Sequence, residues 1–283
     1  MIPAAFDYLA PTSLADALAA LAEAGDDAKV LAGGQSLLPV LRMRLNAPEK
    51  VIDLGRVEEL RGIRDEGDHI VIGAMTTHAD VAASELVAQH AAVLAAATAE
   101  VADPQVRHRG TLGGALVHAD PAGDLGAPIL ALDAELVIAG PGGERTVAAS
   151  DFFQDLFQTA VGDDELLTAI RIPKHTGWGG HYEKFVRVSH QWSIVAVAAT
   201  IRVVDGTIAE AKVGLTNMGS TPVRASAAEA ALVGLAPGSE EARAACAKAS
   251  EGTNPPSDLN GDADYRRHLA NVLTGRAVAA AAG

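Results

Sequence analysis

A short glycine-rich stretch gives the first sign of binding chemistry in this sequence. Ala32-Gly33-Gly34-Gln35-Ser36 lies between an apolar run and a segment with helical spacing. A diphosphate requires several backbone N–H donors that converge on it, and glycines let the backbone come close without a Cβ clash. The stretch has neither the Gly-Lys-Ser/Thr of a P-loop nor the G-x-G-x-x-G of a dinucleotide fold. It therefore suits a pyrophosphate, although an ordinary tight turn explains it equally well.

A second glycine-rich stretch lies further along the chain. Arg109-Gly110-Thr111-Leu112-Gly113-Gly114 again frees the backbone, and Thr111 can supply a hydroxyl. The segment continues to Asp120 and Asp124, whose carboxylates can bind ribityl or ribose hydroxyls. Taken alone, this stretch is also compatible with a tight turn. Two such stretches in one chain predict a clamp for one large phosphate-containing ligand.

Other reactive side chains have simpler interpretations. None of the nine histidines occurs in H-E-x-x-H or another recognised metal spacing. No G-x-S-x-G is present, so we interpret Ser36 as a helix cap and phosphate ligand rather than a nucleophile. Cys246, the only cysteine, is expected to be a small buried hydrophobic residue. It can form neither an internal disulfide nor a four-cysteine zinc or iron–sulfur site, so any such cluster must belong to another chain.

Strand and helix signals surround the first stretch. Ser13 and Gly25 predict the two ends of an amphipathic helix. Residues 29–31 then predict a strand that enters the glycine turn, residues 36–45 a helix, and residues 50–53 another strand.

The middle of the chain mixes strands with helices. We predict a hairpin, two helices and three further strands, at residues 62–72, 85–101, 128–132, 135–139, 145–147 and 166–172. Residues 174–180 have the composition of a linker. The segments beyond it predict a three-stranded antiparallel sheet followed by three helices, at residues 181–188, 193–204, 207–215, 225–235, 239–249 and 264–276. The chain is therefore predicted to have an α+β fold.

The composition of the chain restricts the classes of partner that it can bind. The chain has 283 residues, 49% of them hydrophobic and 20% charged, which is enough to bury a core in two or three modest domains. A formal net charge of -14 argues against nucleic acid and anionic membranes as partners. No apolar run approaches the roughly 20 residues of a membrane span, and the first residues lack the basic start of a signal peptide. We expect a cytoplasmic protein that is not integral to a membrane.

Together these motifs resemble the FAD-binding medium subunits of the carbon monoxide dehydrogenase and xanthine dehydrogenase families, over nearly the whole chain. The resemblance is carried by both glycine-rich stretches and by Leu37-Leu38-Pro39, Ile72-Gly73-Ala74, Asp103-Pro104-Gln105-Val106-Arg107, Ala119-Asp120-Pro121, Leu166-Leu167, Tyr182-Glu183-Lys184-Phe185, Leu215-Thr216-Asn217 and Gly261-Asp262-Ala263-Asp264-Tyr265-Arg266. It implies a two-part FAD-binding domain of the PCMH/vanillyl-alcohol-oxidase type, followed by a C-terminal domain with the three-stranded sheet and a helical bundle. The corresponding domains are residues 1–56, 57–174 and 178–283.

The resemblance also implies the residues that contact FAD. Those that line the pyrophosphate and ribityl chain are Val30, Leu31, Ala32, Gly33, Gly34, Gln35, Ser36, Leu37, Thr111, Leu112, Gly113, Gly114 and Ala115. Asp124 would contact a polar group of the cofactor, Val101 and Leu167 would pack on it, Lys184 would lie near the flavin, and Trp192 would cover the ring. One position departs from the family, which commonly has Asn or Asp where this chain has Ala115. The missing side-chain hydrogen bond is worth roughly 0.5–1.5 kcal/mol.

The same resemblance implies partners. A large subunit would carry the molybdenum cofactor and a small subunit two [2Fe-2S] clusters, as a dimer of heterotrimers that can also associate with the inner face of the membrane. Electrons would pass from molybdenum through the clusters to FAD in this chain and then to an external acceptor. Two alternatives remain open from the residues: a stand-alone FAD-dependent oxidase, and a scaffold subunit that has lost FAD, with Ala115 as the first sign of that loss.

Overall fold

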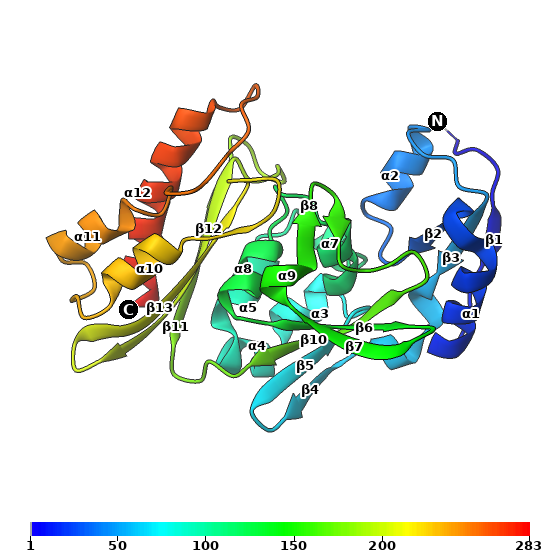
Figure 1. Cartoon of the computed structure of the whole chain (residues 1–283), viewed down its shortest axis with the longest axis horizontal. Coiled ribbons are helices and arrows are strands. Elements are labelled where there is room, and N and C mark those ends of the chain that lie inside the picture. The colour runs from blue at the N-terminus through cyan, green and yellow to red at the C-terminus, as the bar shows by residue number, and fades with distance from the viewer. Residues whose placement is uncertain (1) are drawn as a thin grey trace.

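Three larger β-sheets follow one another along the chain in this computed structural model, which describes residues 2–283 and also contains a two-stranded sheet (Figure 1). The N-terminal sheet lies at one end of the elongated molecule, the largest sheet in the middle, and the C-terminal sheet at the other end. Each of these three sheets has its own cluster of buried apolar side chains. The predicted α+β fold is therefore confirmed.

The N-terminal sheet is parallel, with the strand order β1-β3-β2. Its elements are β1 (Asp7–Leu9), α1 (Leu14–Ala24), β2 (Ala28–Leu31), α2 (Leu37–Arg42) and β3 (Lys50–Asp53). The Ser13 side chain caps α1 by accepting a backbone N–H bond at 3.1 Å, and Gly25 ends this helix with a φ of +59°. Leu21 of α1 packs in one core with Ile52 of β3. The two predicted caps and both predicted strands are present.

The middle sheet is antiparallel, with the strand order β4-β5-β10-β6-β7. Its strands are β4 (Ile63–Glu66), β5 (His69–Gly73), β6 (Glu135–Gly140), β7 (Gly143–Ala148) and β10 (Leu166–Pro173). Short helices and one hairpin fill the connections: α3 (His78–Ala83), α4 (Glu85–His90), α5 (Ala92–Ala99), α6 (Pro104–Arg107), α7 (Leu112–His118), α8 (Gly126–Ala131), α9 (Ala149–Phe152), β8 (Phe153–Asp155) and β9 (Gln158–Thr159). Helices α5 and α8 also contact the C-terminal sheet.

The single helix predicted at residues 85–101 is in fact two helices. The backbone leaves helical geometry at Ala91, where φ is -148° and the side chain is completely buried. The break allows the carbonyl of His90 to accept a hydrogen bond from the N–H of His175 at 2.9 Å, and the His90 ring to bond Thr176. An Ala-rich sequence contains no residue that marks such a break, because tertiary contacts cause it.

The C-terminal sheet has four antiparallel strands, where the sequence predicted three. Its elements are β11 (Gly179–Phe185), β12 (Val195–Val204), β13 (Thr207–Thr216), β14 (Val223–Arg224), α10 (Ser226–Leu232), α11 (Glu240–Cys246) and α12 (Ala263–Ala281). The additional strand, β14, has two residues, too few to show an alternating pattern. Along β12, Ala196 and Ala198 join the core of the middle sheet while Val195 and Val197 join that of the C-terminal helices. Cys246 is buried there, as predicted.

Candidate functional site

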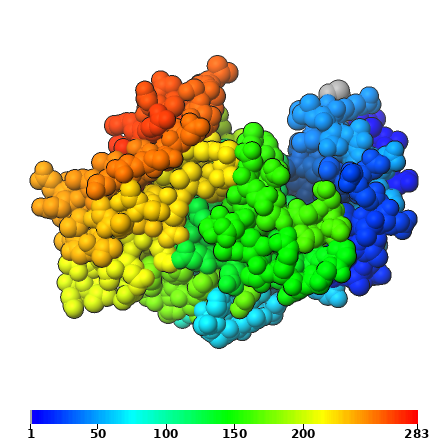
Figure 2. Space-filling view, in the orientation of Figure 1, coloured from blue at the N-terminus to red at the C-terminus, as the bar shows by residue number. Residues whose placement is uncertain are grey.

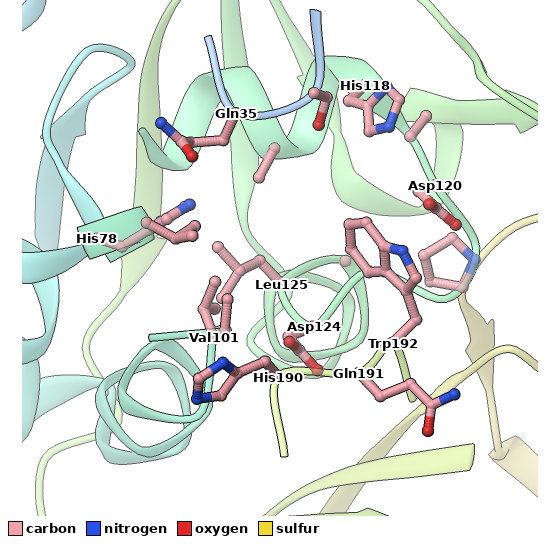
Figure 3. Close-up of a pocket in the computed structure, with 18 of the residues that line it drawn as sticks. Gln35, His78, Val101, His118, Asp120, Asp124, Leu125, His190, Gln191 and Trp192 are labelled. Atoms are coloured by element: carbon pink, nitrogen blue, oxygen red, sulfur yellow. The ribbon is translucent and has the colours of Figure 1, made fainter. Parts of the chain in front are cut away.

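An open cleft lies where the three parts of the chain meet, with a free volume of about 930 Å³ that includes its open side. Figure 2 shows the surface hollowed between the N-terminal segment and the middle of the chain, and Figure 3 shows the cleft itself. Its lining residues are Gln35, Ser36, His78, Val101, Ala102, Val106, Ala115, His118, Ala119, Asp120, Gly123, Asp124, Leu125, Gly126, Phe153, His190, Gln191, Trp192 and Pro222.

The first glycine-rich stretch, residues 32–36, forms the turn between β2 and α2. Gly34 has a φ of +79°, which favours glycine. A Cβ on Gly33 would lie 2.7 Å from the Cα of Gly110, so glycine is needed for the two stretches to touch. The N–H groups of residues 33–36 donate no hydrogen bond to any residue in the range 2–283. Four adjacent N–H groups without an acceptor in the protein make this turn, called the cradle below, a candidate site for an anionic diphosphate.

Ser36 differs from its sequence interpretation in one respect. The structure gives its side chain no capping hydrogen bond to α2, and the residue has helical rather than extended backbone angles. Helix α2 ends at Arg42, earlier than predicted. Ser36 therefore occupies the N-cap position of α2 without capping it through its side chain, and it lines the cleft.

The second glycine-rich stretch uses its N–H groups within the protein. Thr111 caps α7, where its side-chain oxygen accepts from the N–H of Gly114 at 3.2 Å and its carbonyl accepts from Ala115 at 3.1 Å. The N–H groups of Leu112 and Gly113 donate to the carbonyls of Thr76 and Ala74, at 3.0 and 2.8 Å. This stretch holds the base of the cleft together and leaves few backbone donors for a ligand.

The residues predicted to bind FAD fall into three groups. Those that line the cleft are Gln35, Ser36, Val101, Ala115 and Asp124. Those in the turn, in its flanking elements or in the adjoining start of α7 are Val30, Leu31, Ala32, Gly33, Gly34, Leu37, Thr111, Gly113 and Gly114. This second group borders the cleft without lining it. The remaining three, Leu112, Leu167 and Lys184, also lie outside the lining, and the two leucines belong to the core of the middle sheet.

Lys184 forms part of a buried polar cluster on Asp124. Its ammonium lies 2.8 Å from Oδ2 of Asp124, and the two side chains are only 8% and 5% exposed. Oδ1 of Asp124 accepts from the Tyr182 hydroxyl at 2.8 Å and from the Ser193 hydroxyl at 2.9 Å. Lys184 also donates to the carbonyl of Glu100 at 3.2 Å. Burial, together with the Asp124 carboxylate, raises the pKa of the Tyr182 phenol well above its usual value. The Lys184 charge is therefore paired with Asp124.

Several cleft residues had no signal in the sequence, among them His78, Phe153, His190 and Gln191. His190 and Gln191 precede β12, in a segment that the sequence shows only as a gap between strands. The carbonyls at residues 193 and 194 each accept a bond from Asn217, which fixes this segment. Trp192, predicted to cover the ring, lies in the cleft wall and is 56% exposed. Long-range contacts of this kind leave no periodic pattern.

The described part of the chain contains neither a metal-binding group of side chains nor a membrane-spanning helix. Within residues 2–283, no group of three or more His, Cys, Asp or Glu side chains is placed to hold a metal ion. No helix in the same range is long and apolar enough to cross a membrane. The cleft thus combines an anion cradle with apolar and aromatic walls, an arrangement suited to an organic cofactor with a diphosphate.

Comparison with known proteins identifies the class. Residues 4–175 match the FAD binding domain in molybdopterin dehydrogenase, and residues 180–281 match the CO dehydrogenase flavoprotein C-terminal domain. The chain therefore belongs to the family of FAD-binding medium subunits of molybdenum-containing dehydrogenases. The family assignment and the α+β architecture predicted from the sequence are both confirmed.

Individual relatives resemble the chain from end to end. It is 41% identical to the carbon monoxide dehydrogenase medium chain of Hydrogenophaga pseudoflava, over 99% of this chain and 98% of the relative. It is 37% identical to the caffeine dehydrogenase subunit beta of Pseudomonas sp. (strain CBB1), over 100% and 96%. Reconstituted CO dehydrogenase from Oligotropha carboxidovorans superposes with a TM-score of 0.96 at 42% identity, over 100% and 99% of the two chains.

Proposed function

We propose that this chain is the electron-exit subunit of a molybdenum hydroxylase and holds FAD in the cleft described above. A small partner subunit with [2Fe-2S] clusters delivers electrons to it, and a large partner subunit with the molybdenum cofactor oxidises the substrate. When bound, FAD can store an electron pair and reduce an external acceptor. The observation that carries the proposal is the set of four N–H groups at residues 33–36 that have no acceptor, in a chain of this family.

The cleft residues have separate roles in this proposal. Residues 33–36 bind the diphosphate through their N–H groups, while Thr111 and the start of α7 hold that turn in place. Val101 packs on the cofactor, and Asp124 accepts a hydrogen bond from one of its polar groups. Leu112, Leu167 and Lys184 act from behind the wall, the leucines through the core and Lys184 through its bonds to Asp124 and Glu100.

Substrate choice belongs to the large partner. Relatives with at least 37% identity over their whole length are named for substrates as different as carbon monoxide and caffeine. Similar chains therefore occur in dehydrogenases named for unlike substrates, which supports a role for this subunit downstream of the substrate site. We infer that the complex is a dimer of heterotrimers located in the cytoplasm, and that it can associate with the inner face of the membrane.

We further propose three domains, at residues 1–56, 57–174 and 178–283. Support comes from the three separate sheets and from the two matched family models, which meet between residues 175 and 180. Limited proteolysis should cleave the full chain in the exposed turn around Gly177 before it cleaves elsewhere in the last two domains.

The test is to tag the chain in its native host, purify it gently, and measure FAD, molybdenum, iron and copurifying chains. We expect one FAD per chain together with molybdenum, iron and two further subunits. A chain that elutes alone with flavin and oxidises a substrate would identify a stand-alone oxidase. A complex that contains molybdenum and iron but no flavin would identify a scaffold subunit.

A further inference from the structure

His78 is a cleft residue that the sequence motifs do not single out. It is the first residue of α3, directly after the cap residue Thr77, and its N–H donates to the carbonyl of Gly110 at 2.9 Å. Its side chain is only 4% exposed, yet it lines the cleft. In Figure 3 it lies on the same side as Gln35 and Val101, across the cleft from Trp192. The ring is thus buried against the glycine stretches at the edge of the ligand space.

The two ring nitrogens of His78 have different surroundings. Nδ1 is completely buried and has no hydrogen-bond partner. The opposite edge faces the second glycine stretch, because a Cβ on Gly110 would lie 2.7 Å from Cδ2 and 2.9 Å from Nε2. A buried N–H without an acceptor is costlier than a buried lone pair without a donor, so the proton belongs on Nε2. Nε2, unlike Nδ1, is not fully buried, so it is the nitrogen through which this cleft-lining ring can present an N–H donor.

We propose that His78 is a further ligand of the bound cofactor, and that its neutral imidazole donates a hydrogen bond from Nε2 to a diphosphate oxygen. This inference rests on the proposed function, since it assumes that the cleft holds FAD. The donor joins the four N–H groups of residues 33–36, to which it is linked through the contact of Gly33 with Gly110. It also explains why a polar ring that lacks any partner within residues 2–283 is kept in this buried position.

The protonation state agrees with this role. Burial, with a smaller contribution from the nearby Arg107 guanidinium, lowers the pKa of His78 to about 4. The ring is then uncharged at neutral pH and contributes a hydrogen bond rather than a positive charge.

Two variants separate the hydrogen bond from the packing. His78→Gln places an amide N–H near the position of Nε2, whereas His78→Met fills similar space without a donor. Hydrogen bonds to charged groups contribute roughly 1.5–3 kcal/mol, so we expect His78→Met to weaken FAD binding about tenfold to a hundredfold. His78→Gln should bind within a few-fold of the unaltered chain. The measurement is a fluorescence titration of the full deflavinated chain with FAD.

A matched control comes from His90, which is 7% exposed, lies outside the cleft and bonds Thr176. His90→Gln should leave the FAD dissociation constant unchanged even where it lowers the unfolding temperature. Titration with ADP and with riboflavin locates the contact, and we expect His78→Met to weaken ADP binding but not riboflavin binding. An imidazole ¹⁵N spectrum of the FAD-bound chain should show the proton of His78 on Nε2.

The results that overturn the inference are distinct from those that overturn the proposed function. If the unaltered chain fails to bind FAD, the proposed function is wrong. If the unaltered chain binds FAD and His78→Met binds it equally well, only the role of His78 is wrong. Equal weakening by His78→Gln and His78→Met, or weakening of riboflavin alone, would likewise reject a hydrogen bond from Nε2 to the diphosphate.

Discussion

The two glycine-rich stretches look alike in the sequence but do different work in the structure. Residues 33–36 keep four N–H groups without an acceptor in the protein, whereas residues 112–115 donate theirs to carbonyl and hydroxyl oxygens of the chain. The first stretch is therefore the one proposed to hold the ligand, and the second supports it through its own hydrogen bonds. Glycine content alone does not distinguish the two, because the distinction depends on where each N–H group points.

The difference follows from how each stretch meets its helix. Gly34 turns the backbone with a φ of +79°, and the side chain of Ser36 leaves the start of α2 uncapped. Thr111, by contrast, caps α7 in the extended conformation that is usual for such a residue. The second stretch also donates backbone hydrogen bonds to the carbonyls of Ala74 and Thr76. In the uncapped turn the backbone N–H groups remain free to bind a ligand, whereas in the capped turn they already have acceptors within the protein.

The largest expected effect is at Gly33, where the two stretches touch. In Gly33→Ala the new Cβ would meet the backbone of Arg109 and Gly110, which cannot move aside as a side chain would. The cradle should shift, and FAD affinity should fall by about a hundredfold or more, equivalent to roughly 2.7 kcal/mol. FAD content after purification and a fluorescence titration measure this loss. Gly142→Ala, with no atom within 4 Å of its Cβ, is the control.

The next largest effect, a loss of stability, tests whether the second stretch is a structural support. A Cβ on Gly113 would lie 2.5 Å from that of Ala74, inside the core beneath the cleft. Gly113→Ala should lower the free energy of unfolding by roughly 1–3 kcal/mol through overpacking. Urea denaturation measures the change. FAD affinity of the folded fraction should fall far less than in Gly33→Ala. If it fell more, the second stretch and not the first would be the main ligand contact.

A smaller effect is expected at the cap of α7. Thr111→Val removes the acceptor for the N–H of Gly114 and should cost about 1 kcal/mol of stability. Thr111→Ser keeps the oxygen and should restore most of that stability. If Thr111→Val weakens FAD binding tenfold or more while Thr111→Ser does not, the hydroxyl also contacts the cofactor, and the second stretch is more than a support.

The smallest expected effect is an increase in FAD affinity. Ala115 lines the cleft at the position where the family commonly has Asn or Asp. Ala115→Asn should add a hydrogen bond to FAD worth roughly 0.5–1.5 kcal/mol, or a two- to tenfold lower dissociation constant. Ala115→Val adds bulk without a donor and should not strengthen binding. An Asn variant that binds no better than Val would mean that this side chain does not reach the cofactor.

The sequence predicted the local features and missed those created by distant contacts. The caps at Ser13 and Gly25 were read correctly because neighbouring residues determine them. The break at Ala91 and the strand β14 were missed because packing creates them. In the cleft, the motifs led to Gln35 and Ser36, whereas His78, His190 and Gln191 were missed because tertiary contacts bring them there.

The cluster on Asp124 joins two parts of the chain. Both of its carboxylate oxygens accept hydrogen bonds from side chains of the C-terminal part, namely Tyr182, Ser193 and Lys184. The wall between the middle and C-terminal parts is therefore held by the protein's own side chains. Because none of these three donors lines the cleft, substitutions outside the lining can still loosen the wall and change FAD affinity.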